Sequence, residues 1–407
     1  MVGAASGASA KPRKIILPAS AIAGLSPFAF LQASPTYDSA VIRRALFWGS
    51  LAALGWTHVG YPLATAVLAR VRPRPVRKGG IEPTVAFIVA AHDEEVVIER
   101  RVANLLALDY PPDMLEIVVV SDASTDRTDE LVESIAAEHS QVRLLRVPRR
   151  GKTAAQDSAV RATSSELLAF SDANTHWRAD ALRKLVRNFA DPEVAYVCGR
   201  HFYEQADGTN REWIYARYEG WLRRNESQIG SITGGVGPIY AVRRQDYVEL
   251  DPRIGHDIVL PYLLAQRGRR AIVDPEAVAW EKPARDIADE YGRKVRMFEH
   301  AWLILFRGGM LRRLGPLHRL ELVSHRHLRY ASGALHLLLL ASSIGLLRAG
   351  RVYRVLFGAQ VALLLAAAAR PGVARYYVVV TWATIPAFVS YVRGGVSPIW
   401  EKAEGSR

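Results

Sequence analysis

The sequence predicts an α/β protein whose doubly wound, mostly parallel sheet is flanked by transmembrane helices. Four short apolar runs, at 85–91, 115–120, 142–147 and 166–170, alternate with segments of helical character. Strands and helices in short alternation build parallel sheets with right-handed crossovers. Long apolar segments lie on both sides of this region and predict the membrane helices.

Composition limits the classes of protein that fit this chain of 407 residues. Its net charge of +13 favours partners that carry negative charge, such as nucleic acid, anionic lipid or phosphate-bearing substrates. The single cysteine, Cys198, excludes an intrachain disulfide framework, and its apolar neighbours predict a buried, inert thiol. The sequence contains neither G-x-G-x-x-G nor G-x-x-x-x-G-K-[ST], which argues against a dinucleotide enzyme or a P-loop ATPase.

The amino-terminal part of the chain is predicted to lead into one membrane span. Residues 1–44 are basic and apolar, and within them residues 15–31 fit a signal-peptide core or a short interfacial or re-entrant segment. Residues 45–69 carry no charge and precede a basic stretch, which predicts a transmembrane helix with that flank in the cytoplasm. Residues 70–83, rich in Arg, Pro and Gly, are a predicted linker to a soluble domain over 84–282.

The carboxyl-terminal part is predicted to return to the membrane. Residues 283–329 are basic and aromatic, as in amphipathic helices along an anionic membrane surface. About three transmembrane helices are expected in 330–392, before a tail over 393–407, and the middle apolar run, 355–369, is the shortest. These segments predict a multi-pass protein of the inner (cytoplasmic) membrane with a cytoplasmic catalytic domain.

Polar side chains follow the predicted strands and should meet at one edge of the sheet, where such sheets bind ligands. Asp122 follows the second strand, and its carboxylate can accept hydrogen bonds from a base or ribose, while Lys152 can meet phosphate. Asp172 and Asn174 follow the fourth strand, and two oxygen ligands at this spacing suit a divalent cation, Mg²⁺ or Mn²⁺. An Asp-Asn pair is also common in turns, so the prediction depends on the agreement of the other segments.

Four segments resemble, in order and spacing, motifs of the membrane-bound glycosyltransferases of family 2, which carry a GT-A-type nucleotide-sugar domain. They are A-A-H-D-E-E at 90–95, S-D-A-S-T-D at 121–126, R-G-K-T-A-A-Q-D at 150–157 and S-D-A-N at 171–174. In the family the acid matching Asp122 binds uracil, and the D-x-D segment matching Asp172 and Asn174 holds the donor diphosphate and metal. The resemblance implies donor-binding roles for Ala91, Asp93, Glu95, Asp122, Lys152 and Asp172.

Later segments extend the resemblance. The run G-G-V-G-P-I-Y-A at 234–241 is similar to the loop beside the acceptor sugar, which implies acceptor contacts for Gly234, Gly235 and His256. The segment G-H-D at 255–257 occupies the place of a D-D or E-D motif, whose final acid, here Asp257, is the general base. The run R-K-V-R-M at 293–297 resembles Q-x-x-R-W or R-x-x-R-x, and the resemblance implies donor contacts for Arg293 and Arg296.

Some positions depart from the family pattern. The departures are Asp93 and Asp157 for Asn, Ala123 for Gly, Asn174 for Asp, His256 for an acid and Met297 for Trp. Those at 174, 256 and 297 leave metal affinity, acceptor type and processive polymerisation open.

These features predict a membrane-embedded, inverting glycosyltransferase that moves a sugar from a nucleoside-diphosphate sugar, with UDP expected, to a glycan or lipid-linked acceptor. Exopolysaccharide or cell-envelope glycan synthesis is the expected setting. A divalent ion at Asp172, with Lys152 or Arg296, would stabilise the leaving diphosphate, while Asp257 removes the acceptor proton. Direct displacement inverts the anomeric configuration.

Two other functions remain open at this point. One is a lipid glycosyltransferase that transfers once to a polyprenyl phosphate or sphingolipid, and the other is a catalytically weak scaffold of a polysaccharide assembly complex. Membrane lipids and other polysaccharide-export subunits are the further partners expected. Nucleic acid is not, because the basic residues cluster beside apolar runs and no nucleic-acid-binding motif is present.

Overall fold

A computed structural model describes residues 39–203, 211–282, 287–370, 372–394 and 396–397. Contacts divide the chain into two units, residues 1–42 and 43–407, and the second unit holds the sheet and most of the helices. The predicted segment 1–44 and the predicted tail 393–407 lie mostly outside the described residues.

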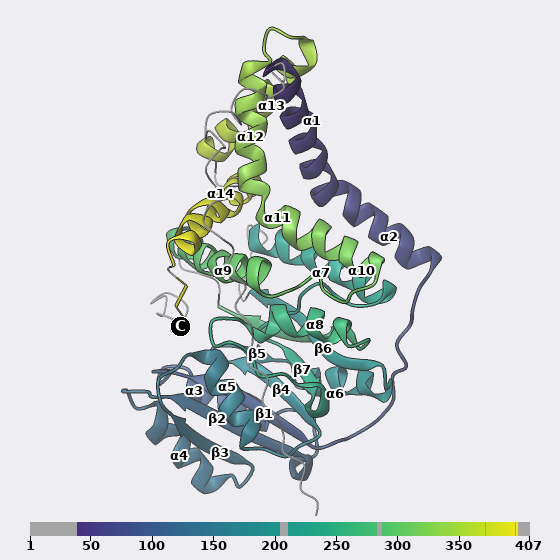
Figure 1. Cartoon of the computed structure of the whole chain (residues 1–407). Helices are drawn as coiled ribbons and strands as arrows, with labels where there is room; N and C mark the ends of the chain where they lie inside the picture. The colour runs from purple at the N-terminus through teal and green to yellow at the C-terminus, as the bar shows by residue number, and fades with distance from the viewer. Residues whose placement is uncertain (1–38, 204–210, 283–286, 371, 395, 398–407) are drawn as a thin grey trace, which may run out of the picture. The chain divides into compact units, whose positions relative to one another are not determined.

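Eight strands form one mixed sheet in the order β3-β2-β1-β4-β7-β6-β8-β5 (Figure 1). The first four in this order run parallel to one another, as predicted, and they are β1 (Val85–Ala91), β2 (Leu115–Asp122), β3 (Val142–Val147) and β4 (Leu167–Asp172). Asp122 and Asp172 are the last residues of β2 and β4. The parallel register therefore brings both carboxylates to one edge of the sheet.

The other half of the sheet adds two strands that run against the rest, so the sheet is mixed, although most of its strands are parallel as predicted. This half contains β5 (His176–Trp177), β6 (Val194–Tyr203), β7 (Tyr240–Arg243) and β8 (Arg270–Glu281). β7 runs antiparallel to β4 and β6, and β5 runs antiparallel to β8, while β6 and β8 are parallel. β7 is only four residues long and follows a glycine-rich loop, so hydrophobic periodicity does not reveal its direction.

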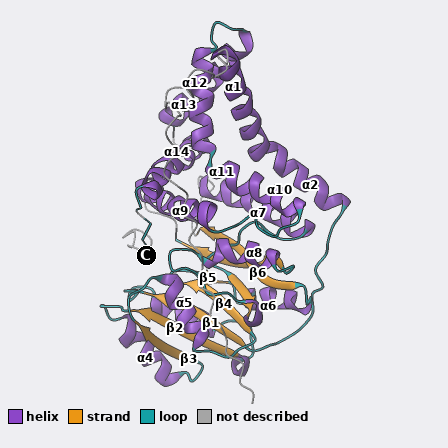
Figure 2. Cartoon of the chain, viewed as in Figure 1, coloured by secondary structure: helices purple, strands orange, loops and turns teal. Residues whose placement is uncertain are grey.

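Helices cover both faces of the sheet (Figure 2), so alternate residues of β1 enter different cores. Phe87 and Val89 pack with α3 (Ile98–Leu106), α4 (Thr128–Glu138) and α6 (Ala181–Val186). Ile88 packs on the opposite face with α5 (Lys152–Arg161) and α8 (His256–Gln266). Burial on both faces explains the continuous apolar runs of these strands.

Cys198 lies in the core on the α5 and α8 face, and its side chain is fully buried. Burial raises the pKa of its thiol to about 12, so the thiolate is scarce at neutral pH. The prediction of a buried, inert thiol is confirmed.

The helices that follow β1 and β2 begin several residues after these strands end, α3 at Ile98 and α4 at Thr128. The two loops before these helices bond to each other: the backbone N–H of Asp93 donates to Ser124 Oγ at 3.1 Å.

Three helical segments are long and apolar enough to cross a membrane: Ser39–Val71, α13 (Arg351–Ala369) and α14 (Val373–Val392). The first combines α1 (Ser39–Gly55), a π-helical turn (Trp56–Gly60) and α2 (Tyr61–Val71). Among the C-terminal runs the short helix is α12 (Ser332–Gly345), not the middle one as expected, because α13 begins earlier, at Arg351.

The remaining helices connect the sheet domain to these apolar helices. They are α7 (Arg211–Ile229), α9 (Ile287–Arg307), α10 (Pro316–Leu322), a π-helical turn (Val323–His327) and α11 (Leu328–Tyr330); 3₁₀ turns occur at Pro112–Met114, Arg187–Ala190 and Arg244–Asp246. α9 packs on α14, where Trp302 Nε1 donates to the carbonyl of Thr384 at 3.1 Å. α7 packs on α2, where Tyr61 Oη donates to Glu226 Oε1 at 2.6 Å.

Asp274, on β8, binds Lys78 in the segment before β1. We expect loss of the Asp274 carboxylate to destabilise the fold. This fully buried carboxylate accepts bonds from Lys78, Arg187 and Asn188 at 2.8–3.1 Å. Asp274→Asn removes the buried charge that pairs with Lys78 and Arg187 and should lower the free energy of unfolding by about 2 kcal/mol, measured by chemical denaturation in detergent. Glu130→Gln, in an exposed pair, is the control and should change little. Equal stability of the two variants would contradict this role.

Candidate active site

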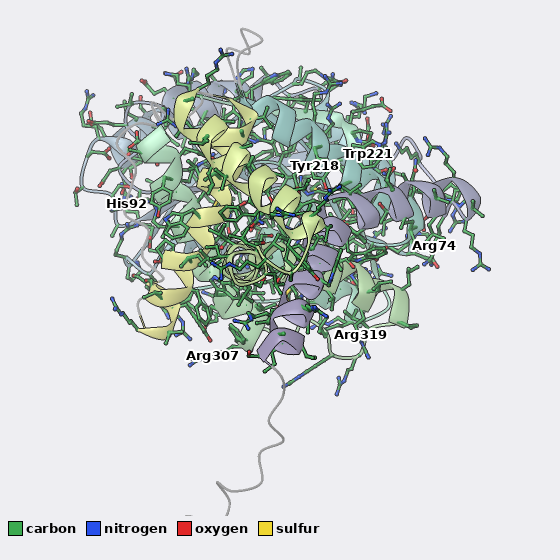
Figure 3. The ribbon with its side chains drawn as sticks, turned by 90° about the horizontal axis from the view of Figure 1, so that it is seen from above. Arg74, His92, Tyr218, Trp221, Arg307 and Arg319 are labelled. Atoms are coloured by element: carbon green, nitrogen blue, oxygen red, sulfur yellow. The ribbon has the colours of Figure 1, made fainter. Side chains whose placement is uncertain are left out.

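One cavity of about 840 Å³ lies at the carboxyl edge of β1, β2 and β4 and extends to the apolar helices. It brings together many residues that the sequence selected: Ala91, Asp122, Lys152, Asp172, Asn174, Gly235, His256, Asp257, Arg293 and Arg296. Asp93, Glu95 and Gly234 do not line it. Figure 3 labels His92 and Tyr218, which line the cavity from the loop after β1 and from α7.

Asp122 is held by the turn that precedes α5. Its carboxylate accepts hydrogen bonds from Arg149 Nη1 at 2.7 Å and from the backbone N–H groups of Arg150 and Gly151 at 2.8 and 2.9 Å. The side chain is only 3% exposed, yet it contributes to the cavity wall. A carboxylate has about four acceptor positions, so Asp122 retains capacity for one further donor.

Asp93 and Glu95 join the loops after β1 and β2. Asp93 Oδ1 accepts from the backbone N–H of Thr125 at 2.6 Å, and Glu95 Oε2 accepts from that of Arg127 at 3.1 Å. Burial acts to raise the pKa of Asp93, but the bonds from Thr125 and the charge of His92 outweigh it and lower the pKa. Within the same loop, His92 and Glu94 line the cavity wall instead.

Backbone conformation explains two of the departures from the family pattern. Asp93 has φ of 51° and Ala123 has φ of 55°, both in the left-handed region. Asn and Asp adopt this region more readily than most residues, so Asp93 can replace Asn with little strain. Ala123 stands where glycine would fit without a steric cost.

Lys152 and Asp172 form an ion pair at the centre of the cavity wall. Burial acts to lower the pKa of Lys152, but the carboxylates of Asp172, Asp257 and Glu281 raise it above its ordinary value. Lys152 is therefore a cation that Asp172 binds in this structure. The position of the Lys152 ammonium marks the Asp172 carboxylate as a place where a cation can bind.

A divalent cation would find two protein oxygen donors here, from Asp172 and Asn174, which line the same cavity. Among the described residues no group of three His, Cys, Asp or Glu side chains is arranged to hold a metal ion. Phosphate oxygens and water would have to supply the other ligands, as is usual for Mg²⁺. The residues fit a cation that arrives with a diphosphate.

Asp257 lies at the start of α8 in a space kept by glycines. Its carbonyl oxygen accepts the backbone N–H of Gly235 at 2.7 Å. A Cβ at position 237 would lie 3.2 Å from Asp257 Oδ2, and one at position 235 would lie 2.0 Å from Tyr196 Oη. The loop backbone therefore approaches Asp257 as closely as glycine allows. Gly234 packs on the Arg326 guanidinium rather than facing the cavity.

Helix α9 brings Arg293, Arg296 and Met297 to the opposite side of the cavity. Arg293 Nη2 donates to Tyr203 Oη at 2.7 Å, and Arg293 Nε donates to Glu290 Oε2 at 2.8 Å. These bonds hold the Arg293 guanidinium at the cavity wall.

Glu281, at the end of β8, lines the cavity but belongs to no motif that the sequence analysis selected. It accepts from Thr175 Oγ1 at 3.0 Å and lies 3.0 Å from His201 Nε2. Burial acts to raise its pKa, but His201, Arg293 and Thr175 lower it, so the group is an anion. Its partners lie on β6 and after β4, and only the fold brings them together.

A buried charge cluster lies where the cavity approaches the apolar helices. Glu226 Oε1 lies 2.6 Å from His325 Nδ1, and Thr233 donates its backbone N–H to Glu226 Oε2 at 3.0 Å. Arg329 pairs with Glu219 beside them. Burial would raise the pKa of Glu226, but His325, Tyr61 and Arg326 lower it to about 2. The cluster fixes the chain just before Gly234 and Gly235.

Gly235→Ala should abolish any activity that needs Asp257 in place, because a Cβ there clashes with Tyr196 Oη and lies 2.9 Å from the Asp257 carbonyl. We expect turnover to fall at least about 100-fold, since a displacement near 1 Å of a reacting group costs this much. The measurement is donor turnover by purified protein. Gly80→Ala, in the exposed segment before β1 with nothing near its Cβ in the described residues, is the control. A Gly235→Ala protein as active as that control would show that the close approach of the glycine loop does not position Asp257.

Glu321 should make stability depend on pH. Burial raises the pKa of Glu321 from 4.5 to about 7, Glu226 adds to the effect and His318 opposes it. A raised pKa contributes stability that is complete below about pH 4.5 and is lost as the pH rises through about 7. Relative to Glu321→Gln, the natural protein should therefore lose roughly 2 kcal/mol of unfolding free energy between about pH 5 and 8. Denaturation curves of both proteins across this range check it, and parallel pH profiles would refute it.

The comparisons with known proteins agree with the chemistry of this site. Residues 86–250 match Glycosyl transferase family 2. The chain is 29% identical over 216 residues to the beta-monoglucosyldiacylglycerol synthase of Nostoc sp., covering 51% of this chain and 46% of that protein. It is 26% identical over 232 residues to the poly-beta-1,6-N-acetyl-D-glucosamine synthase of Staphylococcus aureus, covering 55% and 56%. The chain thus spans about half the length of these relatives.

A solved structure shares the fold. The mannosyltransferase PcManGT from Pyrobaculum calidifontis, in complex with GDP-Man and Mn²⁺, superposes with a TM-score of 0.71 at 24% identity, over 87% of this chain and 98% of that one. Residues 86–250 are thus similar to Glycosyl transferase family 2, and most of the chain shares the fold of this mannosyltransferase.

Proposed function

We propose that the chain is a membrane-embedded, inverting glycosyltransferase that moves a sugar from a nucleoside-diphosphate sugar, with UDP as the nucleotide, to an acceptor hydroxyl. The observation that carries the proposal is the single cavity in which Asp122, Lys152 and Asp172 face the same space as Asp257. Such a cavity provides a donor site and a base for the acceptor. The apolar helices favour an inner-membrane protein with this domain in the cytoplasm.

On the donor side, the residues divide between the base and the diphosphate. Asp122 is held rigidly at the end of β2 and has one acceptor position left for a donor group of the nucleotide base. Lys152 and Arg296 supply positive charge for the phosphates, and Arg293 is fixed beside them by Tyr203. A divalent cation at Asp172 and Asn174 would neutralise charge on the leaving diphosphate.

On the acceptor side, Asp257 is the proposed general base. Its carboxylate is an acceptor-only group when ionised, and it can take the hydroxyl proton as the oxygen attacks the anomeric carbon. The attack and the departure of the diphosphate occur on opposite faces of the sugar, so a single step inverts the configuration. In this structure the Lys152 ammonium pairs with the Asp172 carboxylate. When donor binds, the Lys152 ammonium would turn from Asp172 to the phosphates.

The far end of the cavity favours an acceptor attached to a lipid. Val373, Tyr376, Val380 and Thr384 of α14 line the cavity, so its wall includes one face of a candidate membrane span. Apolar and hydroxyl side chains together suit a lipid chain that carries a sugar or a hydroxyl headgroup. The names of the two relatives specify a glucosyldiacylglycerol and an N-acetylglucosamine polymer, and a single transfer to lipid is the second candidate.

Release of nucleotide from UDP-, GDP- and dTDP-sugars, by the protein in lipid nanodiscs with Mg²⁺, Mn²⁺ or EDTA, tests the proposal. We expect metal-dependent turnover of a UDP-sugar in the presence of lipid acceptors. Asp257→Asn should lower kcat by about 100-fold or more, because it removes the base. Asp172→Asn should lower turnover by a similar factor and weaken its dependence on metal.

Glu116→Gln is the matched control, because it breaks a surface ion pair with Arg143 between β2 and β3, away from the cavity. It should keep nearly full activity. Product size separates the acceptors: a glycolipid with one added sugar identifies single transfer, and a long glycan identifies a polymerase. Silence with every donor, from protein that unfolds cooperatively, would overturn the proposal and favour a scaffold in a polysaccharide assembly complex.

A further inference from the structure

Helix α5 contacts both the donor side and the base side of the cavity. Its first residue is Lys152, which pairs with Asp172, and the turn before it binds Asp122. One residue further on, Thr153 Oγ1 donates to the carbonyl of Ile254 at 2.9 Å, three residues before Asp257. Figure 1 shows α5 and α8 on the same face of the sheet, where both contribute to one core.

The second turn of α5 holds the residue directly before Asp257. His256 Nδ1 lies 3.0 Å from Gln156 Oε1, and His256 Nε2 lies 3.1 Å from Asp157 Oδ1. Tyr247 Oη donates to Asp157 Oδ1 at 2.5 Å and lies 2.7 Å from His256 Nε2. The His256 side chain is 1% exposed and that of Asp157 is 6% exposed. Both ring nitrogens of His256 therefore face oxygen atoms in a buried site.

Aromatic packing fixes the plane of this ring. The rings of His256 and Tyr247 both stack on Phe170, with centroids 6.2 and 5.9 Å from it. Phe170 belongs to β4 and lies two residues before Asp172. The ring thus has one packed orientation, set by the strand that carries Asp172.

Two departures from the family pattern meet at this contact. The pattern has a neutral amide at the position of Asp157 and an acid at the position of His256. In this chain the acid of the pair is Asp157 on α5, and His256, whose side chain can carry positive charge, stands directly before Asp257, the proposed base. Asp157 and His256 are 99 positions apart in sequence. As in the family pattern, one of these two positions carries an acid and the other does not.

We infer that Asp157 and His256 are a positioning pair that sets the distance of Asp257 from Lys152 and Asp172. Neither residue is proposed to touch the substrate, and His256 is thereby assigned a different role from the acceptor contact that the sequence predicted. The inference rests on the proposed role of Asp257 as the base. Since α5 carries Lys152 and α8 carries Asp257, a contact between the two helices fixes the reacting groups relative to each other.

The position of a base affects the chemical step more than donor binding. Loss of the pair should therefore lower kcat while the KM for the donor stays nearly unchanged. His256→Glu places a second carboxylate against Asp157, and two like charges in a buried site repel each other. Asp157→Asn removes the acceptor charge that His256 and Tyr247 share.

A double-mutant cycle of Asp157→Asn and His256→Glu tests the inference, because the double variant restores the amide and the acid of the family pattern. We expect kcat to fall about 10-fold in Asp157→Asn and about 100-fold in His256→Glu, with the donor KM within about threefold of the natural value. The double variant should recover to within about threefold of the natural kcat. Unfolding midpoints of all four proteins are measured in parallel.

Asp274→Asn is the matched control for destabilisation alone, because it removes a buried carboxylate outside the cavity wall. It should lower the unfolding midpoint while the folded protein keeps its kcat. A double variant as slow as the product of the two single effects would overturn the positioning role, as would four equal kcat values with altered midpoints. In both cases the natural protein still turns over donor, so the proposed function stands. If the natural protein turns over no donor, the proposed function fails, and this inference fails with it.

Discussion

The site depends on how the negative charge at the carboxyl edge of the sheet is balanced. Parallel pairing of β2, β1 and β4 brings Asp122 and Asp172 to one edge, and buried carboxylates are costly without partners. The chain meets this requirement with one segment, since Arg149 and the following backbone amides bind Asp122 while Lys152 binds Asp172. That segment continues as α5, which bonds to the residues before Asp257. Charge balance and the placement of Asp257, the proposed base, therefore depend on the same segment. The proposed donor diphosphate would bind where Arg149 and Lys152 already lie.

Strands β1, β2 and β4 could be predicted because they are buried on both faces and their apolar runs are continuous. Their ends carry the polar residues that motif spacing selects. The two reversed strands, β5 and β7, could not be predicted, because they are too short for a periodic signal and their partners lie far away in sequence. Periodicity also does not reveal the left-handed conformation of Asp93 in the loop after β1, on either side of which His92 and Glu94 line the cavity.

The parts of the site that the sequence could not reveal are those assembled from distant elements. Glu281 needs β8 beside β6, and the contact of Asp157 with His256 needs α5 beside α8. None of these residues stands out within its own segment. Asp157 and His256, taken singly, are departures from the family pattern with no evident role. The apolar helices were predictable as apolar runs, but their share in the cavity through α14 follows only from packing on α9.

A structure of the protein with UDP and Mn²⁺ bound, determined in nanodiscs, tests the central claim most directly. The account predicts that the base contacts Asp122, that the diphosphate and the metal lie between Asp172 and Arg296, and that Lys152 has turned from Asp172 to the phosphates. Nucleotide bound outside this cavity, or an intact Lys152–Asp172 pair beside bound diphosphate, would contradict it.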